Sequence, residues 1–94
     1  MKRWLLVCYD IRDPKRLRRV AQLMEGHGTR EQYSIFRCHL SDRERERLRW
    51  ELARIMEPED AVLFVPLCPS CSTRVSSIGA QPEWETNAPR VIIV

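Results

Sequence analysis

The chain has 94 residues, of which 44% are hydrophobic and 31% are charged. This length suits one domain with a modest two-layer core, and the composition excludes a disordered chain. The net charge of +3 is uneven, because residues 1–40 carry nine Lys or Arg against four Asp or Glu, whereas residues 41–94 carry seven against nine. The first part is therefore the candidate surface for a polyanion, although an Arg-rich composition by itself gives the same imbalance.

No part of the sequence predicts a membrane segment. No run approaches the ~18 apolar residues that cross a bilayer, and the apolar run at residues 4–9 is too short for a signal peptide. Four cysteines without an export signal predict reduced thiols. We therefore expect a cytoplasmic protein with no membrane contact.

The first predicted elements are a strand over residues 3–11 and a helix that follows it. The strand is rich in aliphatic and aromatic residues, as a central strand buried on both faces is. Asp13 before Pro14 is a strong helix start, because the carboxylate caps free amides and Pro14 needs no hydrogen bond at the first helical position. The apolar stripe of this helix is Leu17, Val20, Ala21 and Met24, and Gly26, His27 and Gly28 end it.

Residues 30–40 predict β-structure, either one long bent strand or two short strands hinged near Ser34 and Ile35. Ser41 and Glu44 form a capping box that opens a second helix, whose inward residues are Leu48, Leu52 and Ile55. The charges on its other face pair at helical spacing, as Glu44 with Arg47, Glu46 with Arg49, and Arg47 with Glu51. That pattern indicates a solvated face and not a nucleic-acid ridge.

The last part of the chain predicts one strand, a long loop and an apolar tail. Residues 61–67 form the strand, and Pro66 places it at a sheet edge or where it leaves the sheet. Residues 68–89 are loop-like, with 74–79 as a candidate short strand. The apolar residues 91–94 need cover, and we expect them to add a strand to their own sheet or to that of a second copy.

This order of elements predicts an α+β fold. A β-α-β-β-α-β succession with one antiparallel sheet and both helices on one face is the ferredoxin-like sandwich. We expect a single domain over residues 1–94.

Asp10 is the first candidate site residue, because it stands at the end of a strand and Asp13 already caps the helix. One carboxylate is a poor site for Mg²⁺, which prefers one or two carboxylates together with water and phosphate oxygens. A homodimer with two-fold symmetry would supply a second Asp10, and the pair could share Mg²⁺ or Mn²⁺. Such a metal polarises a phosphodiester or generates hydroxide.

Basic residues surround the end of the first strand and could hold phosphates without reading bases. They are Arg12, Lys15, Arg16, Arg18, Arg19 and Arg30. Tyr9 and Phe36 could orient or stack, although an aromatic on a strand is more often core.

Cys68 and Cys71 form a Cys-Pro-Ser-Cys motif for which we find no favoured role. A redox pair would need a helix to open there, and the following residues are poor helix formers. Structural zinc needs four ligands, whereas the pair supplies two, so the ligand count argues against zinc unless Cys8, Cys38, a histidine or a second chain contributes.

Three segments together resemble the CRISPR-associated Cas-two family over nearly the whole chain. They are Tyr9, Asp10 and Ile11 at the end of the first strand, Gly-Thr-Arg-Glu-Gln-Tyr-Ser-Ile-Phe at residues 28–36, and Val-Pro-Leu-Cys at residues 65–68. The resemblance implies a ferredoxin-like homodimer in which residues 80–94 dock on the partner protomer. It implies a metal-binding and catalytic role for Asp10, with Tyr9 and Phe36 as supporting aromatics.

The same resemblance places phosphate contacts on Arg19 and Arg30. A further arginine that some members carry two residues before Arg19 is Leu17 here, and Arg16 and Arg18 are the candidates to substitute for it. Position 31 is Glu where family members often have an aliphatic residue.

The resemblance implies three functions. The first is a nucleic-acid-binding, Mg²⁺-dependent endonuclease or endoribonuclease of CRISPR spacer acquisition and antiviral defence, acting beside an integrase subunit. The second is a non-catalytic dimeric adaptor that bridges integrase subunits on DNA. The third is a toxin-like ribonuclease similar to virulence-associated protein D.

Overall fold

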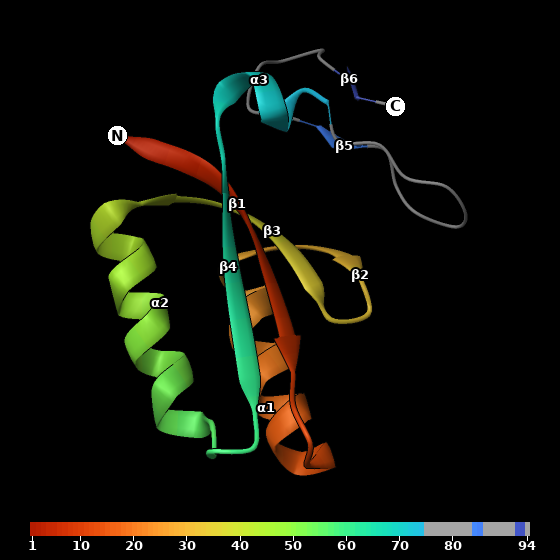
Figure 1. Cartoon of the computed structure of the whole chain (residues 1–94), viewed down its shortest axis with the longest axis vertical. Coiled ribbons are helices and arrows are strands. Elements are labelled where there is room, and N and C mark those ends of the chain that lie inside the picture. Colours follow the sequence, from red (N-terminus) through yellow and green to blue (C-terminus); the bar gives the residue numbers. More distant parts are fainter. Residues whose placement is uncertain (75–83, 86–91, 94) are drawn as a thin grey trace.

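The structure is a computed structural model, and it describes residues 1–74, 84–85 and 92–93. In chain order its elements are β1 (Lys2–Asp10), α1 (Pro14–Glu25), β2 (Gly28–Gln32), β3 (Ile35–Ser41), α2 (Asp42–Ile55), β4 (Ala61–Leu67), α3 (Pro69–Ser72), β5 (Trp84–Glu85) and β6 (Ile92–Ile93). Strands β1 to β4 form one sheet in the order β2-β3-β1-β4, with every neighbouring pair antiparallel. Helices α1 and α2 lie on one face of this sheet (Figure 1). The predicted ferredoxin-like α+β fold is confirmed.

The core lies between the sheet and the two helices. Alternate residues of β1 and β3 point into it, and Val20 and Met24 of α1 meet them together with Leu48 and Leu52 of α2. The strand residues in the core are Leu5, Val7, Tyr9, Phe36, Cys38 and Leu40. Because side chains alternate along a strand, the intervening residues lie on the opposite face of the sheet, which neither helix covers.

The predicted helix starts are confirmed. Asp13 Oδ2 accepts from the backbone amide of Arg16 at 3.0 Å, with Pro14 at the first position of α1. Ser41 and Glu44 form the reciprocal capping box of α2, with donor-acceptor distances of 2.8 and 3.1 Å. On the outer face of α2 the Arg47–Glu51 pair is present at 4.0 Å, whereas Glu44 lies 3.6 Å from Lys2 and Glu46 lies 3.4 Å from Arg45.

The strand expected at residues 30–40 is two strands. Chain direction reverses at Tyr33 and Ser34, so that β2 pairs with β3 and begins at Gly28, two residues before the expected start. Pro66 lies in the edge strand β4, as predicted.

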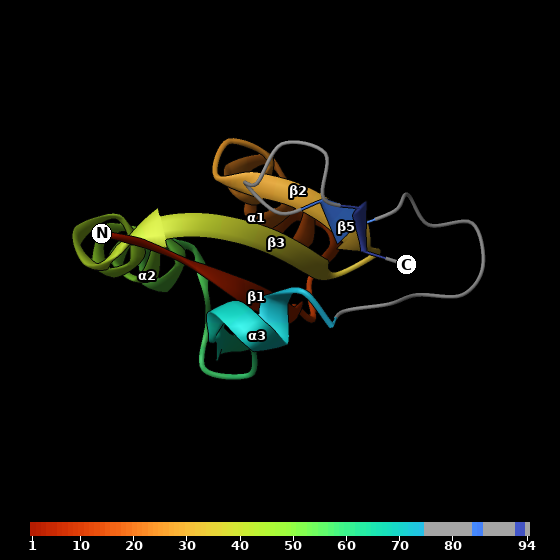
Figure 2. The same ribbon diagram turned by 90° about the horizontal axis from the view of Figure 1, so that it is seen from above.

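The expectation of a loop over residues 68–89 is wrong in two places. Pro69–Ser72 form the short helix α3, which begins directly after β4 and lies beside the N-terminal part of β1 (Figure 2). Trp84–Glu85 form β5, which pairs with Ile92–Ile93 of the tail in a separate two-stranded sheet. Residues 75–79 of the candidate strand, and most of the segment 80–94 expected to dock on a partner, lie outside the described residues.

Among the described helices, none has the length and apolar content that crossing a membrane requires.

Candidate functional site

Asp10 ends β1 on the face of the sheet that the helices leave open. Strand alternation turns Tyr9 toward the helices, where it is 5% exposed, and turns Asp10 the other way, where its side chain is 64% exposed. Its Oδ2 forms an ion pair with the guanidinium of Arg12 at 3.2 Å. Since Asp13 caps α1, Asp10 is free of that task, as the sequence predicted.

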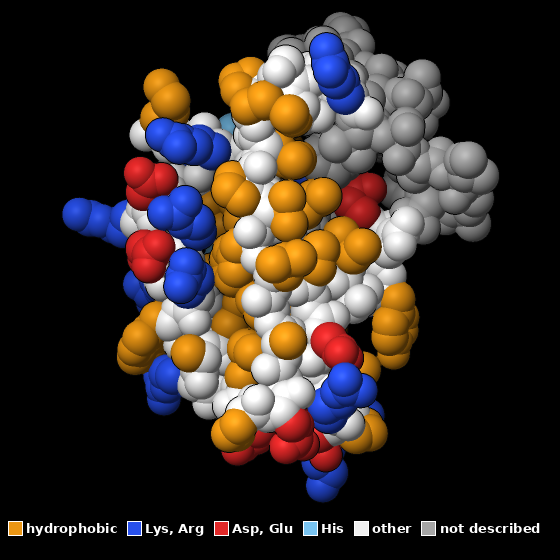
Figure 3. All heavy atoms as spheres, viewed as in Figure 1, with side chains coloured by type: hydrophobic (Ala, Val, Ile, Leu, Met, Phe, Trp, Pro, Cys, Tyr) orange, Lys and Arg blue, Asp and Glu red, His pale blue; other side chains and the backbone are white. Residues whose placement is uncertain are grey.

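The surface beside Asp10 is largely apolar. We name its apolar side chains the open face, and they are Trp4, Leu6, Cys8, Ile35, Leu63, Val65 and Leu67. All seven are half-buried or exposed, and Leu63 is 61% exposed. Arg37 and His39 of β3 lie on the same side of the sheet, opposite Leu6 and Trp4. Figure 3 looks onto this face and shows hydrophobic side chains gathered along the sheet, with the charged side chains of α2 at its flank. An apolar sheet face of this kind is typical of a surface that another protein covers.

A buried charged pair crosses the neighbouring strands β2 and β3. Arg37 Nε lies 3.2 Å from Glu31 Oε2, and both side chains are about nine-tenths buried. Burial raises the pKa of Glu31, although the charge of Arg37 opposes that rise. The Arg37 guanidinium also lies 5.5 Å from the centroid of the Trp4 ring. Glu31, the position that departs from the family pattern, is thus neutralised within the chain.

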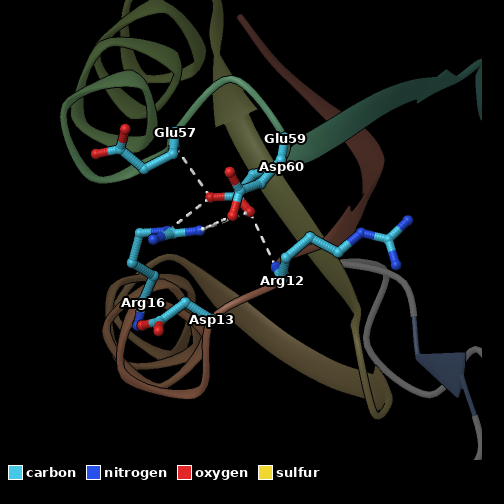
Figure 4. Close-up of polar contacts among 6 residues, drawn as sticks. All are labelled: Arg12, Asp13, Arg16, Glu57, Glu59 and Asp60. Atoms are coloured by element: carbon cyan, nitrogen blue, oxygen red, sulfur yellow. Dashed lines mark hydrogen bonds and ion pairs between the residues drawn. The ribbon is translucent and has the colours of Figure 1, made fainter.

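Arg16 was expected to contact phosphate, and the structure gives it a different task. Its Nε donates to Asp60 Oδ2 at 2.8 Å, and its terminal nitrogen donates to Glu59 at 3.1 Å. Asp60 also accepts from the backbone amides of Arg12 at 2.9 Å and Glu57 at 3.0 Å, and its side chain is 0% exposed (Figure 4). These bonds, the Arg16 side chain first, hold the pKa of Asp60 well below its usual range. Arg16 therefore joins the first turn of α1 to the α2–β4 loop, and the Arg12 amide joins the β1–α1 loop to the same carboxylate.

Arg18 and Arg30 lie together on the helix side of β1. They line a pocket of about 300 Å³ whose other polar residues are Tyr9 and Tyr33. The Arg30 guanidinium lies 5.0 Å from the centroid of the Phe36 ring and 5.9 Å from that of Tyr33, within the range of cation-π attraction. One terminal nitrogen donates to the Tyr33 carbonyl at 2.6 Å, and the other lies 3.6 Å from Glu25 Oε2.

The two aromatics expected to support the site are largely internal. Phe36 is fully buried, and its ring stacks with that of Tyr9 at a centroid distance of 6.2 Å. Tyr9 Oη is buried without a hydrogen-bond partner among the described residues. Burial raises the pKa of this phenol, while Arg30 acts in the opposite sense. A ligand in the pocket could accept a hydrogen bond from the Tyr9 hydroxyl.

The remaining candidate cations are spread over α1 and its start. Arg12 and Lys15 are exposed near Asp10 in the chain, and Arg19 is exposed on the α2 side of α1. Arg19 borders a hollow of about 280 Å³ together with Leu23, Glu51, Arg54 and Ile55. Arg18 and Arg30 thus lie at the Tyr9 pocket, Arg19 lies between the helices, and Arg12 lies beside Asp10.

Residue-by-residue reasoning did not single out Tyr33. It is 74% exposed at the turn between β2 and β3 and lies against Arg30 at the pocket edge. The sequence does contain a signal for Tyr33, because it is an aromatic residue between the polar residues Gln32 and Ser34, where packing in the core does not explain it.

The donor set at Asp10 fits Mg²⁺ in kind but not in number. Exposed carboxylate oxygens are ligands that Mg²⁺ accepts, and it keeps several waters when it binds one or two of them. In the described part of the chain no group of three or more His, Cys, Asp or Glu side chains is arranged to hold a metal ion. At Asp10 one chain offers a single carboxylate, and the pair Cys68 and Cys71 offers two thiols of the four ligands that structural zinc takes.

The chain resembles known proteins over most of its length. A family model described as CRISPR associated protein Cas2 matches residues 1–75. CRISPR-associated endoribonuclease Cas2 3 of Synechocystis sp. is 38% identical over 90 residues, which are 95% of this chain and 96% of the relative.

Solved structures agree with this match. Streptococcus pyogenes Cas2 superposes with a TM-score of 0.74 at 33% identity, over 81% of this chain and 99% of that one. A chain in a partial Cas6-RT-Cas1--Cas2 complex superposes with a TM-score of 0.71 at 25% identity, over 87% of this chain and 96% of that one. The resemblance predicted from three short segments is confirmed, and the chain belongs to the CRISPR-associated Cas2 family.

Proposed function

We propose that this chain is a cytoplasmic, homodimeric subunit of the CRISPR spacer-acquisition machinery that binds nucleic acid and hydrolyses phosphodiesters with the help of Mg²⁺. The observation that carries the proposal is the place of Asp10. It is an exposed carboxylate that no helix cap requires, and it borders an apolar sheet face. The name of the Synechocystis relative, an endoribonuclease, supports the reaction class.

Dimerisation through the open face would complete the metal site. Two copies packed face to face about a two-fold axis at the Asp10 end of β1 would bring their two Asp10 carboxylates together. Two carboxylates held close repel unless a cation or proton lies between them, so the pair would bind a divalent ion. Residues 80–94 would dock on the partner protomer and extend this interface.

The side chains have separate tasks in this proposal. The Asp10 pair would hold Mg²⁺ or Mn²⁺, which supplies polarisation of a phosphodiester and activation of water. Arg12, Lys15, Arg18, Arg19 and Arg30 would neutralise backbone phosphates, a contact that weakens steeply with salt. Tyr33 and the Arg30 guanidinium offer flat surfaces on which an unpaired base can stack.

Arg12 would adjust the charge at Asp10. Its guanidinium lies 3.2 Å from the carboxylate and is equally exposed. In the dimer it could turn toward a phosphate when the metal binds, because an exposed ion pair of this kind contributes little to stability.

A second function, the non-catalytic adaptor, is favoured by one observation. A similar chain occurs in the partial Cas6-RT-Cas1--Cas2 complex, and Asp10 already has an ion-pair partner in the single chain. In this case the same basic residues would hold DNA between integrase subunits, and Asp10 would serve only packing and charge.

The two functions separate in one variant. Asp10→Asn, assayed with RNA and with DNA, is expected to lose Mg²⁺-dependent cleavage by at least about 100-fold, the range for loss of one catalytic group. Asp13→Asn is the matched control, because it makes the same chemical change three residues away and Asn caps a helix as well as Asp does. The same proteins are then tested for spacer integration with the integrase subunit.

Each result assigns a function. Cleavage by Asp10→Asn at the rate of Asp13→Asn would overturn the catalytic assignment. Loss of cleavage with intact integration would favour the adaptor. The toxin-like alternative predicts growth arrest when the intact chain alone is expressed, relieved in Asp10→Asn.

A further inference from the structure

The four cysteines divide into two environments. Cys38 is fully buried in the core and Cys8 is half-buried on the open face, and burial raises the pKa of both thiols, that of Cys38 to about 11. Cys68 and Cys71 are exposed, Cys68 as the N-cap residue of α3 and Cys71 within this single turn, which directly follows β4. Thiols with a high pKa are poor nucleophiles, so the chemistry of this chain's cysteines is concentrated at α3.

The two exposed sulfurs face each other. Cys68 Sγ and Cys71 Sγ are 3.0 Å apart, and the backbone amide of Cys71 donates to Cys68 Sγ at 3.3 Å. A disulfide has an S–S bond of about 2.05 Å, so small rotations of the two side chains would bring the sulfurs into bonding distance. The helical turn thus holds the pair ready without displacement of β4.

The surroundings distinguish the two sulfurs. Cys68 Sγ also lies 3.2 Å from the hydroxyl of Ser70, so that a hydroxyl, a thiol and a backbone amide all lie within hydrogen-bond distance of it. The Cys71 thiol, followed by the Ser70 hydroxyl, lowers the pKa of Cys68 to about 7, and the same sulfur contact raises the pKa of Cys71. Near neutral pH Cys68 is therefore the sulfur with thiolate character.

We propose that Cys68 and Cys71 form a reversible dithiol–disulfide site that reacts with low-molecular-weight disulfides, with Cys68 as the attacking thiol and Cys71 as the resolving thiol. The Cys68 thiolate attacks one sulfur of the small disulfide, forms a mixed disulfide and releases one small thiolate. Cys71 then loses its proton and attacks Cys68 Sγ, forms the intrachain disulfide and releases the second small thiolate. The two cysteines lose two electrons together, and the small disulfide gains them.

This site is separate from Asp10. Antiparallel pairing sets Asp10 opposite Ala61 at the start of β4 and Trp4 opposite Leu67 at its end, so the thiol pair lies at the other end of the sheet. There Cys68 borders a groove of about 750 Å³, which is also lined by residues 1–4, His39, the end of β4 and other residues of α3. Oxidation would lock the turn through which the chain passes from β4 to residue 75 and beyond, and would leave the Asp10 end unaltered.

The experiment treats the folded protein with oxidised glutathione near pH 7 and stops the reaction with acid. Remaining thiols are alkylated, and intact mass and peptide mass spectrometry locate the products. We expect one Cys68–Cys71 disulfide in the wild-type chain, with Cys8 and Cys38 recovered as alkylated thiols. Cys71→Ser should instead accumulate glutathione on Cys68, and Cys68→Ser should react with glutathione at least about tenfold more slowly than Cys71→Ser.

Circular dichroism melts check that both variants fold, and a parallel reaction in urea provides the reference for unstructured thiols. In urea the difference between Cys68→Ser and Cys71→Ser should disappear. Equal rates for the two folded variants would overturn the assigned roles. A wild-type chain that gives only mixed or intermolecular disulfides would overturn the site itself.

Discussion

Asp10 and Asp60 show how position decides the task of a carboxylate. Asp10 is exposed and has one loose ion pair, whereas Asp60 is enclosed and accepts from Arg12, Arg16 and Glu57. A carboxylate with that many donors is held ionised and serves structure, while one facing water can take a ligand. The basic residues divide in the same way, because Arg16 is bound within the chain and Arg18 is exposed.

Asp60→Asn is expected to destabilise the fold and to change its pH dependence. The folded chain lowers the pKa of Asp60, so this contribution to stability is full above about pH 4, the value of a free aspartate, and falls as the pH drops below it. Urea denaturation at several pH values measures the effect. The difference in the free energy of unfolding between wild type and variant should be large at pH 7 and should decrease as the pH falls toward 3.

Glu59→Gln is the control for Asp60→Asn, because Glu59 contacts the same arginine from an exposed position. It should change stability far less. A gap that stays constant from pH 7 to pH 3 would contradict the role given to the Asp60 carboxylate.

At the scale of elements, β2 depends on a glycine that the sequence had assigned to the end of a helix. A Cβ atom at Gly28 would lie 2.7 Å from Cys38 Sγ and would also collide with the carbonyl of Arg37. The backbones of β2 and β3 therefore pair only if position 28 lacks a side chain.

Gly28→Ala should consequently cost about 1–3 kcal/mol in the free energy of unfolding, the range for an overpacked site. Gly26→Ala is the matched control, since its nearest neighbour would lie at an ordinary 3.5 Å. Chemical denaturation of both variants measures the difference. Equal stabilities would show that β2 can shift away from β3 at no cost.

The sequence was sufficient for elements whose signals are local. Asp13 before Pro14 and Ser41 before Glu44 marked both helix starts, and the order of strands and helices gave the ferredoxin-like fold. The turn at Tyr33 and Ser34 was left open, because no Gly or Pro marks it. The sequence did not predict α3, because this helix begins at Pro69 and has only four residues, too few for helix propensity to give a signal.

The candidate site was predictable in part for a related reason. Asp10 could be predicted because its place at the end of a strand is a local feature of the sequence. Tyr9 could be predicted because it directly precedes Asp10. The binding of Arg16 to Asp60 joins residues 44 positions apart, and no spacing rule connects them. Likewise, the separation of Arg18 from Arg19 depends on how α1 rests against α2 and the sheet.

For the whole molecule the open face is the decisive surface, since the proposed metal site needs a second copy. Leu63→Glu is expected to weaken the dimer at least about tenfold, because burial of a leucine contributes roughly 1.5–3 kcal/mol and the substitution acts in both copies. Trp50→Glu is the control, as Trp50 is similarly exposed but lies on α2, away from the open face. Sedimentation equilibrium measures both variants, and a tight Leu63→Glu dimer would place the interface elsewhere.

In the proposed dimer, two Asp10 carboxylates from two chains share one divalent cation. Titration of the dimer with Mn²⁺, followed by calorimetry and by electron paramagnetic resonance of the free ion, tests it directly. We predict one tight site for every two chains, absent in Asp10→Asn and retained in Asp13→Asn. One site per chain, or an unchanged site in Asp10→Asn, would contradict it.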